Sequence, residues 1–165
     1  TPNAKIVLTD DLVINDDKGT GYALYAKYDV TIDLNGKTLT VNGGYLAISD
    51  ENKPNVIKNG NVVIAGKSSN FIHTRENNYN AKVKCEDLNI TINSTASWGY
   101  VFNHNYGSID IEANNCEFTF GESVSSTSTY IIARNTGIYN NCTFNLNGRN
   151  EIAKIFSVMR SGFKT

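Results

Sequence analysis

Apolar and polar residues alternate in short runs along this chain, and each run ends at or just before Asn or Gly. The second apolar residue of the run falls at positions 41, 64, 92, 120 and 146, so the runs recur at nearly regular intervals. Alternation with a period of two is the pattern of a strand with one buried face. A repeat of this length is typical of stacked supersecondary units that cover one another's apolar sides.

Two further strand markers recur in step with the first. An alternating segment precedes each run, as in Val30–Leu34, and a short aromatic-led segment follows it. The aromatic-led segments begin at Tyr45, Phe71, Tyr100 and Tyr130, and the last of the series is Ile155-Phe156, which keeps them in phase with the runs. Three strands in a fixed order form one coil of a parallel β-solenoid, and each strand pairs with its equivalent about 4.8 Å away. We predict an all-β solenoid of about six three-strand coils.

Asparagine marks the points where consecutive strands of a coil must bend. Candidate bends are Asn35-Gly36, Asn59-Gly60, Asn114-Asn115 and Asn140-Asn141. Asparagine tolerates the left-handed backbone conformation, and its amide can bond to the equivalent residue of the next coil. The chain has only two prolines, so little interrupts the predicted ladders.

Two segments resemble coils of a known group of proteins. Residues 29–39 (DVTIDLNGKTL) and residues 141–147 (NCTFNLN) are similar to coils of the right-handed parallel β-helix proteins, the pectin-lyase-like group. That group includes pectate lyases, polygalacturonases, phage tailspikes and appendages, and bacterial surface proteins. The resemblance implies a right-handed, single-stranded β-helix at an extracellular or virion surface, which often associates as a homotrimer. It does not select one activity, because the same coil supports many.

Length and charge limit the remaining possibilities. The 165 residues are 40% hydrophobic, and we interpret residues 1–165 as a single β-helix domain cut from a longer chain. A net charge of −1 gives no overall attraction to nucleic acid or to an anionic membrane. No apolar run is long enough for a membrane-spanning helix, so membrane insertion is not expected.

Three cysteines follow the repeat. Cys85, Cys116 and Cys142 are separated by intervals close to the repeat length, and we expect each to begin the strand after a bend. The chain has no Cys-x-x-Cys and no histidine near these positions, so we expect neither a metal site nor a cofactor. We interpret the three residues as a stacked ladder of buried, reduced thiols.

Catalysis would need a pair of carboxylates. Glu86 and Glu117 each follow a cysteine, and we expect them to stack outward in neighbouring coils, where they could act as acid and nucleophile on a glycosidic bond. Asp110 is a third candidate and is no more specific. The Asn-Thr-Asp, Gly-His-Gly and Arg-Ile-Lys motifs of polygalacturonases are absent, and the catalytic residues stay unassigned.

A column of basic and amide side chains follows the aromatic-led strands. Arg75, His104, Arg134 and Arg160 recur with the period of the coils, and His73 and Asn103 lie beside them. Arginine presents paired donors to carboxylates, and asparagine offers a donor and an acceptor to hydroxyls. The column fits an acidic polysaccharide lying along the solenoid axis. A solvated turn and a subunit interface are the alternatives.

Three functions remain open. The first is a recognition or scaffold module of a phage tailspike or appendage, or of a bacterial surface protein, in contact with cell-surface polysaccharide. The second is a polysaccharide lyase or glycoside hydrolase, and the third is a structural spacer or trimerisation segment. We favour the first, because the known enzyme motifs are missing while the coil pattern is strong.

Overall fold

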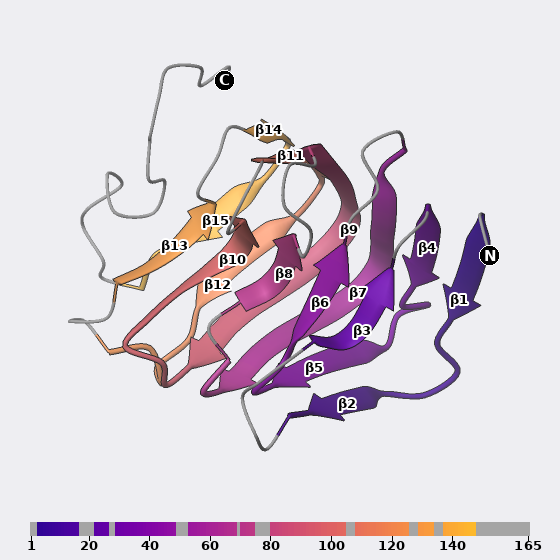
Figure 1. The fold of residues 1–165 in the computed structure, drawn as a ribbon. Helices are drawn as coiled ribbons and strands as arrows, with labels where there is room; N and C mark the ends of the chain where they lie inside the picture. The colour runs from indigo at the N-terminus through magenta and orange to yellow at the C-terminus, as the bar shows by residue number, and fades with distance from the viewer. Residues whose placement is uncertain are drawn as a thin grey trace.

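The structure is a computed structural model that describes residues 3–16, 22–26, 29–48, 53–68, 70–74, 80–104, 108–125, 129–133 and 137–147. All regular secondary structure in these residues is β-strand, and all of the strand pairs are parallel. The coils follow one another along a single axis, so that the colour in Figure 1 changes steadily from one end of the stack to the other. The predicted all-β parallel solenoid is confirmed.

Strands recur in the predicted order of three per coil. In two of the coils, the first and second strands join into one long strand that continues through the bend, namely β7 and β9. The strands are β1 (Ala4–Val7), β2 (Leu12–Asn15), β3 (Tyr22–Ala26), β4 (Val30–Asp33), β5 (Thr38–Asn42), β6 (Tyr45–Ile48), β7 (Asn55–Gly66), β8 (Asn70–Thr74), β9 (Asn80–Ser94), β10 (Trp98–His104), β11 (Ser108–Asn114), β12 (Glu117–Phe120), β13 (Thr129–Ala133), β14 (Gly137–Asn140) and β15 (Thr143–Asn145).

The number of complete turns is smaller than predicted. The coil that contains β14 and β15 has no third strand within the described residues. The described strands form five three-strand coils and a sixth coil of two strands, so the predicted count of about six is slightly too high for complete coils. The segment 155–156, which the pattern predicts as that third strand, lies outside the described residues.

The strands form two sheets that face each other (Figure 1). The larger sheet bends into two arms. The first arm has the order β1-β4-β7-β9-β11-β14, and the second arm has the order β2-β5-β7-β9-β12-β15. The smaller sheet has the order β13-β10-β8-β6-β3. Equivalent residues of successive coils are direct register partners, so each side chain lies over its equivalent in the next coil.

An Asn or Asp in the left-handed conformation lies at the bend between the two arms in each coil from the second onward, and in the second coil Gly36 also has a positive φ. These residues are Asn35, Asn59, Asp87, Asn115 and Asn141, with φ angles of 52°, 60°, 52°, 53° and 50°. Their side chains also connect successive coils, since Asn115 Nδ2 donates to Asp87 Oδ1 at 3.0 Å and Asn141 Nδ2 donates to Asn115 Oδ1 at 2.9 Å. The predicted asparagine bends are confirmed, with an aspartate in one of the five places.

The core lies between the arms and the smaller sheet. One of its columns joins Val41, Ile64, Ile92 and Phe120, which are register partners and are each at most 1% exposed. These are the apolar positions of the alternating runs, so the alternation identified the buried face correctly. Phe118 belongs to the neighbouring column, where its ring stacks on that of Phe144 with 5.1 Å between centroids.

The first coil leaves part of this core uncovered. Ile6 and Leu12 occupy inward positions, opposite Ile32 and Leu39, yet they are 39% and 41% exposed. Their partners in the second coil are only 8% and 2% exposed. The difference shows how much of the burial of each coil depends on the next one in the stack.

Candidate functional site

The predicted basic strip is only partly described. His73 on β8 and Asn103 on β10 are register partners, so the structure brings these two predicted residues together. Both side chains are buried, with 6% and 4% of their surface exposed. Asn103 Nδ2 donates to Asn70 Oδ1 at 2.9 Å, and the His73 ring lies 4.9 Å from the ring of Tyr45. The two residues therefore form part of a covered polar cluster.

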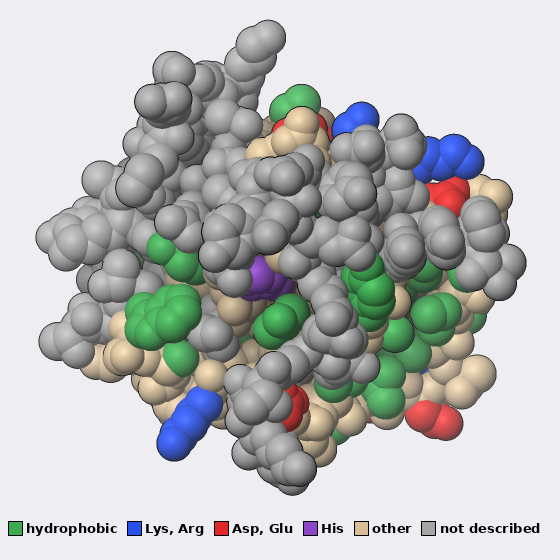
Figure 2. Space-filling view, viewed as in Figure 1, with side chains coloured by type: hydrophobic (Ala, Val, Ile, Leu, Met, Phe, Trp, Pro, Cys, Tyr) green, Lys and Arg blue, Asp and Glu red, His purple; other side chains and the backbone are tan. Residues whose placement is uncertain are grey.

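The remaining residues of the strip cannot be placed in the same way. Arg75, Arg134 and Arg160 lie outside the described residues, and only the backbone of His104 is described, opposite Thr74. Figure 2 shows this side of the molecule, where the Lys, Arg, Asp and Glu side chains of the described residues lie mostly toward the margins. The column of cations thus stays a prediction.

The candidate catalytic carboxylates lie on different arms of the larger sheet. Glu86 is on the first arm, opposite Asn114, and Glu117 is on the second arm, opposite Asn89. The expected outward stack of these two carboxylates is not formed. Asp110 lies on the first arm as an exposed residue opposite Lys82, whose charge is of the other sign.

The position of each cysteine relative to its bend explains why Glu86 and Glu117 do not occupy equivalent positions. Cys85 lies before its bend, opposite Ala113, because the bend residue of that coil is Asp87. Cys116 and Cys142 each come directly after their bend. The expected ladder of three thiols is therefore wrong for Cys85, and only Cys116 and Cys142 occupy equivalent positions. Asp87 takes the place of asparagine at this bend, so a pattern of asparagine pairs does not locate it.

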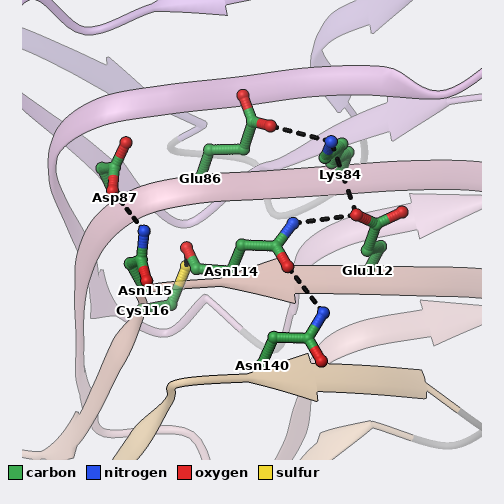
Figure 3. A network of polar contacts seen from close by, with 8 residues as sticks. All are labelled: Lys84, Glu86, Asp87, Glu112, Asn114, Asn115, Cys116 and Asn140. Atoms are coloured by element: carbon green, nitrogen blue, oxygen red, sulfur yellow. Dashed lines mark hydrogen bonds and ion pairs between the residues drawn. The ribbon is translucent and has the colours of Figure 1, made fainter.

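The outward side of the first arm is rich in charge. Lys84 Nζ lies 2.9 Å from Glu86 Oε1 and 3.4 Å from Glu112 Oε1, and Asn114 Nδ2 donates to the same Glu112 oxygen at 2.9 Å (Figure 3). The hydrogen bond and charge of Glu86 raise the pKa of Lys84. The Asn114 amide, followed by Lys84, lowers the pKa of Glu112. We call this surface the charged face, and its ionisable members are Lys5, Asp33, Lys58, Lys82, Lys84, Glu86, Asp110 and Glu112.

The outward side of the second arm has a different composition. Threonine and asparagine dominate it, and Glu117 is the only charged side chain among its described outward strand positions. The small residues Val63 and Ala65 add apolar surface near its middle. We call this surface the threonine–asparagine face. Its members are Val13, Asn15, Thr38, Thr40, Asn42, Asn61, Val63, Ala65, Asn89, Thr91, Asn93, Glu117, Thr119, Thr143 and Asn145.

Hydrogen bonds between coils order the amides of this face. Asn89 Nδ2 donates to Asn61 Oδ1 at 3.1 Å, and Asn42 Nδ2 donates to Asn15 Oδ1 at 2.8 Å. Each such bond uses one amide N–H of the donor and one lone pair of the acceptor. An asparagine side chain has two N–H donors and two lone pairs, so the ladder bonds leave hydrogen-bonding capacity toward solvent. The face thus presents oriented donors and acceptors.

Sequence reasoning missed this face, although its signal is present in the alternating runs. The residue between the two apolar residues of each run, which is polar in four of the five runs, is an outward residue of the second arm. Read in order, these positions are Thr40, Val63, Thr91, Thr119 and Asn145. The apolar positions of the runs predicted the core, and the positions between them define the opposite surface.

Comparison with protein families, with curated proteins and with solved structures finds no match to this chain. The fold assignment therefore depends on strand order and register. The similarity to β-helix proteins depends on the coil pattern alone. Function has to be argued from the chemistry of the two faces.

Two further features of the described residues bear on function. Within the described ranges, no three His, Cys, Asp or Glu side chains come together in a way that could hold a metal ion. No helix in the same part of the chain is long and apolar enough to cross a membrane.

Proposed function

We propose that this chain is a recognition module of an extracellular or virion-surface protein, such as a phage tailspike or appendage or a bacterial surface protein, and that it contacts cell-surface polysaccharide. The observation that supports the proposal most is the contrast between the two arms. One arm carries paired charges, whereas the other presents almost only hydroxyl, amide and methyl groups. A surface of the second kind matches the chemistry of sugar hydroxyls and of the apolar faces of sugar rings.

The arrangement of these groups fits a polymer. Equivalent side chains recur once per coil, about 4.8 Å apart along the axis. A polysaccharide that lies along the axis would therefore meet the same kinds of group repeatedly, from Thr40 past Thr91 to Asn145. Each hydrogen bond contributes only about 0.5–1.5 kcal/mol net, so a useful affinity needs several coils to act together.

The charge of the polymer separates this face from the predicted basic strip. Glu117 is the only charged member of the threonine–asparagine face, so the face favours a neutral polymer over an anionic one. A strip of Arg75, His104, Arg134 and Arg160 would favour an anionic polymer instead. The ionic character of the preferred ligand therefore indicates which surface makes the contact.

The test measures binding of the chain to neutral and acidic bacterial polysaccharides by affinity electrophoresis. Thr91→Arg places a long cation in the middle of the threonine–asparagine face, and we expect it to weaken binding of a neutral polymer at least about tenfold, a loss of about 1.4 kcal/mol. Thr31→Arg makes the same chemical change on the first arm, at a half-buried outward position, and should leave binding unchanged. Far-UV circular dichroism confirms that both variants are folded.

Three outcomes would count against the proposal. Absence of binding to any polymer would remove polysaccharide recognition, and equal losses in both variants would remove the threonine–asparagine face as its location. Polymer that becomes shorter during incubation would identify an enzyme, and mutagenesis would then begin at Glu86, Glu117 and Asp110. A trimer in light scattering, without polymer binding, would favour the structural spacer or trimerisation segment.

A further inference from the structure

Cys116 and Cys142 occupy equivalent positions in adjacent coils of the second arm. The residues that follow them, Glu117 and Thr143, are register partners, and Thr143 N donates to Cys116 O at 2.9 Å. Neighbouring strands are about 4.8 Å apart, which lies inside the range of about 4.4–6.8 Å between Cα atoms that a disulfide requires. Both cysteines precede an inward phenylalanine by two positions, so their side chains point to the same side of the sheet.

The two thiols make only weak hydrogen bonds with their surroundings. Cys116 Sγ donates to Asn114 O at 3.3 Å, and Cys142 Sγ donates to Asn140 O and to Ala113 O, both at 3.4 Å. A thiol is a weak donor, so losing these bonds costs little. Cys116 is 2% exposed, whereas Cys142 is half-buried and gives the pair a route to solvent.

The third thiol differs from this pair. Cys85 is fully buried on the first arm, and its register partner in the next coil is Ala113. In the preceding coil its partner is Ile57. It therefore has no cysteine directly above or below it in the stack. The register therefore matches Cys116 with Cys142 and matches Cys85 with no cysteine.

We propose that Cys116 and Cys142 form a disulfide when the protein meets a small-molecule disulfide such as oxidised glutathione. The Cys142 thiolate attacks one sulfur of glutathione disulfide, which releases one glutathione thiolate and leaves a mixed disulfide. The Cys116 thiolate then attacks Cys142 Sγ, and the second glutathione thiolate leaves. Two protein thiols are oxidised, one glutathione disulfide is reduced to two thiols, and the two protons pass to the released thiolates.

The bond would fasten one coil to the next. It joins the coil of β11 and β12 to the coil of β14 and β15 at the bend between the arms, where backbone pairing already fixes the register. Disulfides persist in extracellular and virion settings and are rare in the cytosol. An efficient cross-link would therefore agree with the extracellular location proposed above, although the chemistry itself does not depend on that location.

The rate of the reaction should depend strongly on pH. Burial raises the pKa of the Cys142 thiol above its ordinary value, and it raises the pKa of Cys116 to about 11. The thiolate is the attacking species, and its fraction rises with pH while the pH is below the pKa of the thiol. We therefore expect cross-linking to be faster at pH 9 than at pH 7.

The experiment incubates the folded chain with oxidised glutathione at both pH values and follows the mass of the protein. We expect loss of two hydrogen atoms from the wild type and from Cys85→Ala. Cys116→Ala and Cys142→Ala should show no such loss. Digestion after glutamate separates Cys85 from Cys116, because Glu86 and Glu112 lie between them, and identifies the linked peptides.

Four results would overturn the proposal. They are a wild type that keeps all three thiols at pH 9, a product that stops at the glutathione adduct, a cross-link that contains Cys85, and a cross-link that survives in Cys116→Ala. Circular dichroism of every variant before oxidation shows whether the thiols were compared in the folded state. Each alanine variant removes only one sulfur atom from the side chain, so folding should be retained.

Discussion

Asn115 provides the sharpest test of what stabilises this solenoid, because the residue both adopts the left-handed backbone of the bend and connects neighbouring coils through its side chain. Its backbone has a φ of 53°, in the left-handed region that L-residues adopt at a cost of about 1–2 kcal/mol. Its amide also donates to Asp87 and accepts from Asn141, at 3.0 and 2.9 Å. Substitution by alanine and by glycine separates the two contributions. Both variants lose the hydrogen bonds, but only alanine has to adopt a strained backbone.

The magnitudes follow from these contacts. Two exposed side-chain hydrogen bonds are worth about 1–2 kcal/mol together, and both variants should lose this amount. Alanine loses the conformational term in addition, while the greater freedom of glycine in the unfolded chain offsets part of the difference. We expect Asn115→Ala to be less stable than Asn115→Gly by about 1 kcal/mol. Urea denaturation followed by far-UV circular dichroism measures both free energies of unfolding.

Asn140 supplies the matched control. It makes the same kind of bond between coils, since its Nδ2 donates to Asn114 Oδ1 at 2.7 Å, but it lies at the end of strand β14 with no positive φ. The order of the two variants should therefore reverse, with Asn140→Ala more stable than Asn140→Gly. The reasoning is refuted if Asn115→Ala equals or exceeds Asn115→Gly in stability, or if both match the wild type.

Two further predictions concern the core and a hydrogen-bonded carboxylate. Phe118→Ala removes a side chain that is 0% exposed and stacked on Phe144, and should cost about 3–5 kcal/mol in urea denaturation. Thr119→Ala, on the outward side of the same strand, should cost about 0.5 kcal/mol, and similar losses in both would contradict the assignment of faces. The pKa of Asp33 is lowered, and the largest cause is the hydrogen bond from the Asn59 amide. The contribution of the ionised Asp33 carboxylate to folding stability is therefore complete above about pH 4, and it is lost as the pH falls through the lower folded-state pKa. Asp33→Asn should therefore flatten stability against pH below about pH 4, and an unchanged acid slope would argue against this role.

The repeat was predictable because it depends on residues close together in the chain. Alternation placed Val41, Ile64 and Ile92 in one buried column, and the structure confirms this. The left-handed bends were predictable for a similar reason, because asparagine favours this conformation wherever the chain must bend. The exception is Asp87, where another residue type adopts the same conformation and shifts the apparent alignment of Cys85.

The candidate site was less predictable because burial of a side chain depends on what packs against it. His73 and Asn103 were expected on an open strip, and their spacing did place them side by side. Their burial comes from other parts of the fold, which the periodicity of one strand does not reveal. The same limit applies to Glu86 and Glu117, whose separation depends on which residue makes the bend.

The equal spacing of three of the five bend residues has a consequence for how such a chain can change in length. Asn59, Asp87 and Asn115 are evenly spaced along the chain, and each holds the same backbone conformation. Duplication or deletion of one such interval would therefore keep every column in register, and would alter the threonine–asparagine face by one row, about 4.8 Å. Insertion of a single residue within an arm would instead exchange its inward and outward side chains. Whole coils are thus the units in which this architecture can evolve. The length of the threonine–asparagine face along the axis then changes in steps of one coil.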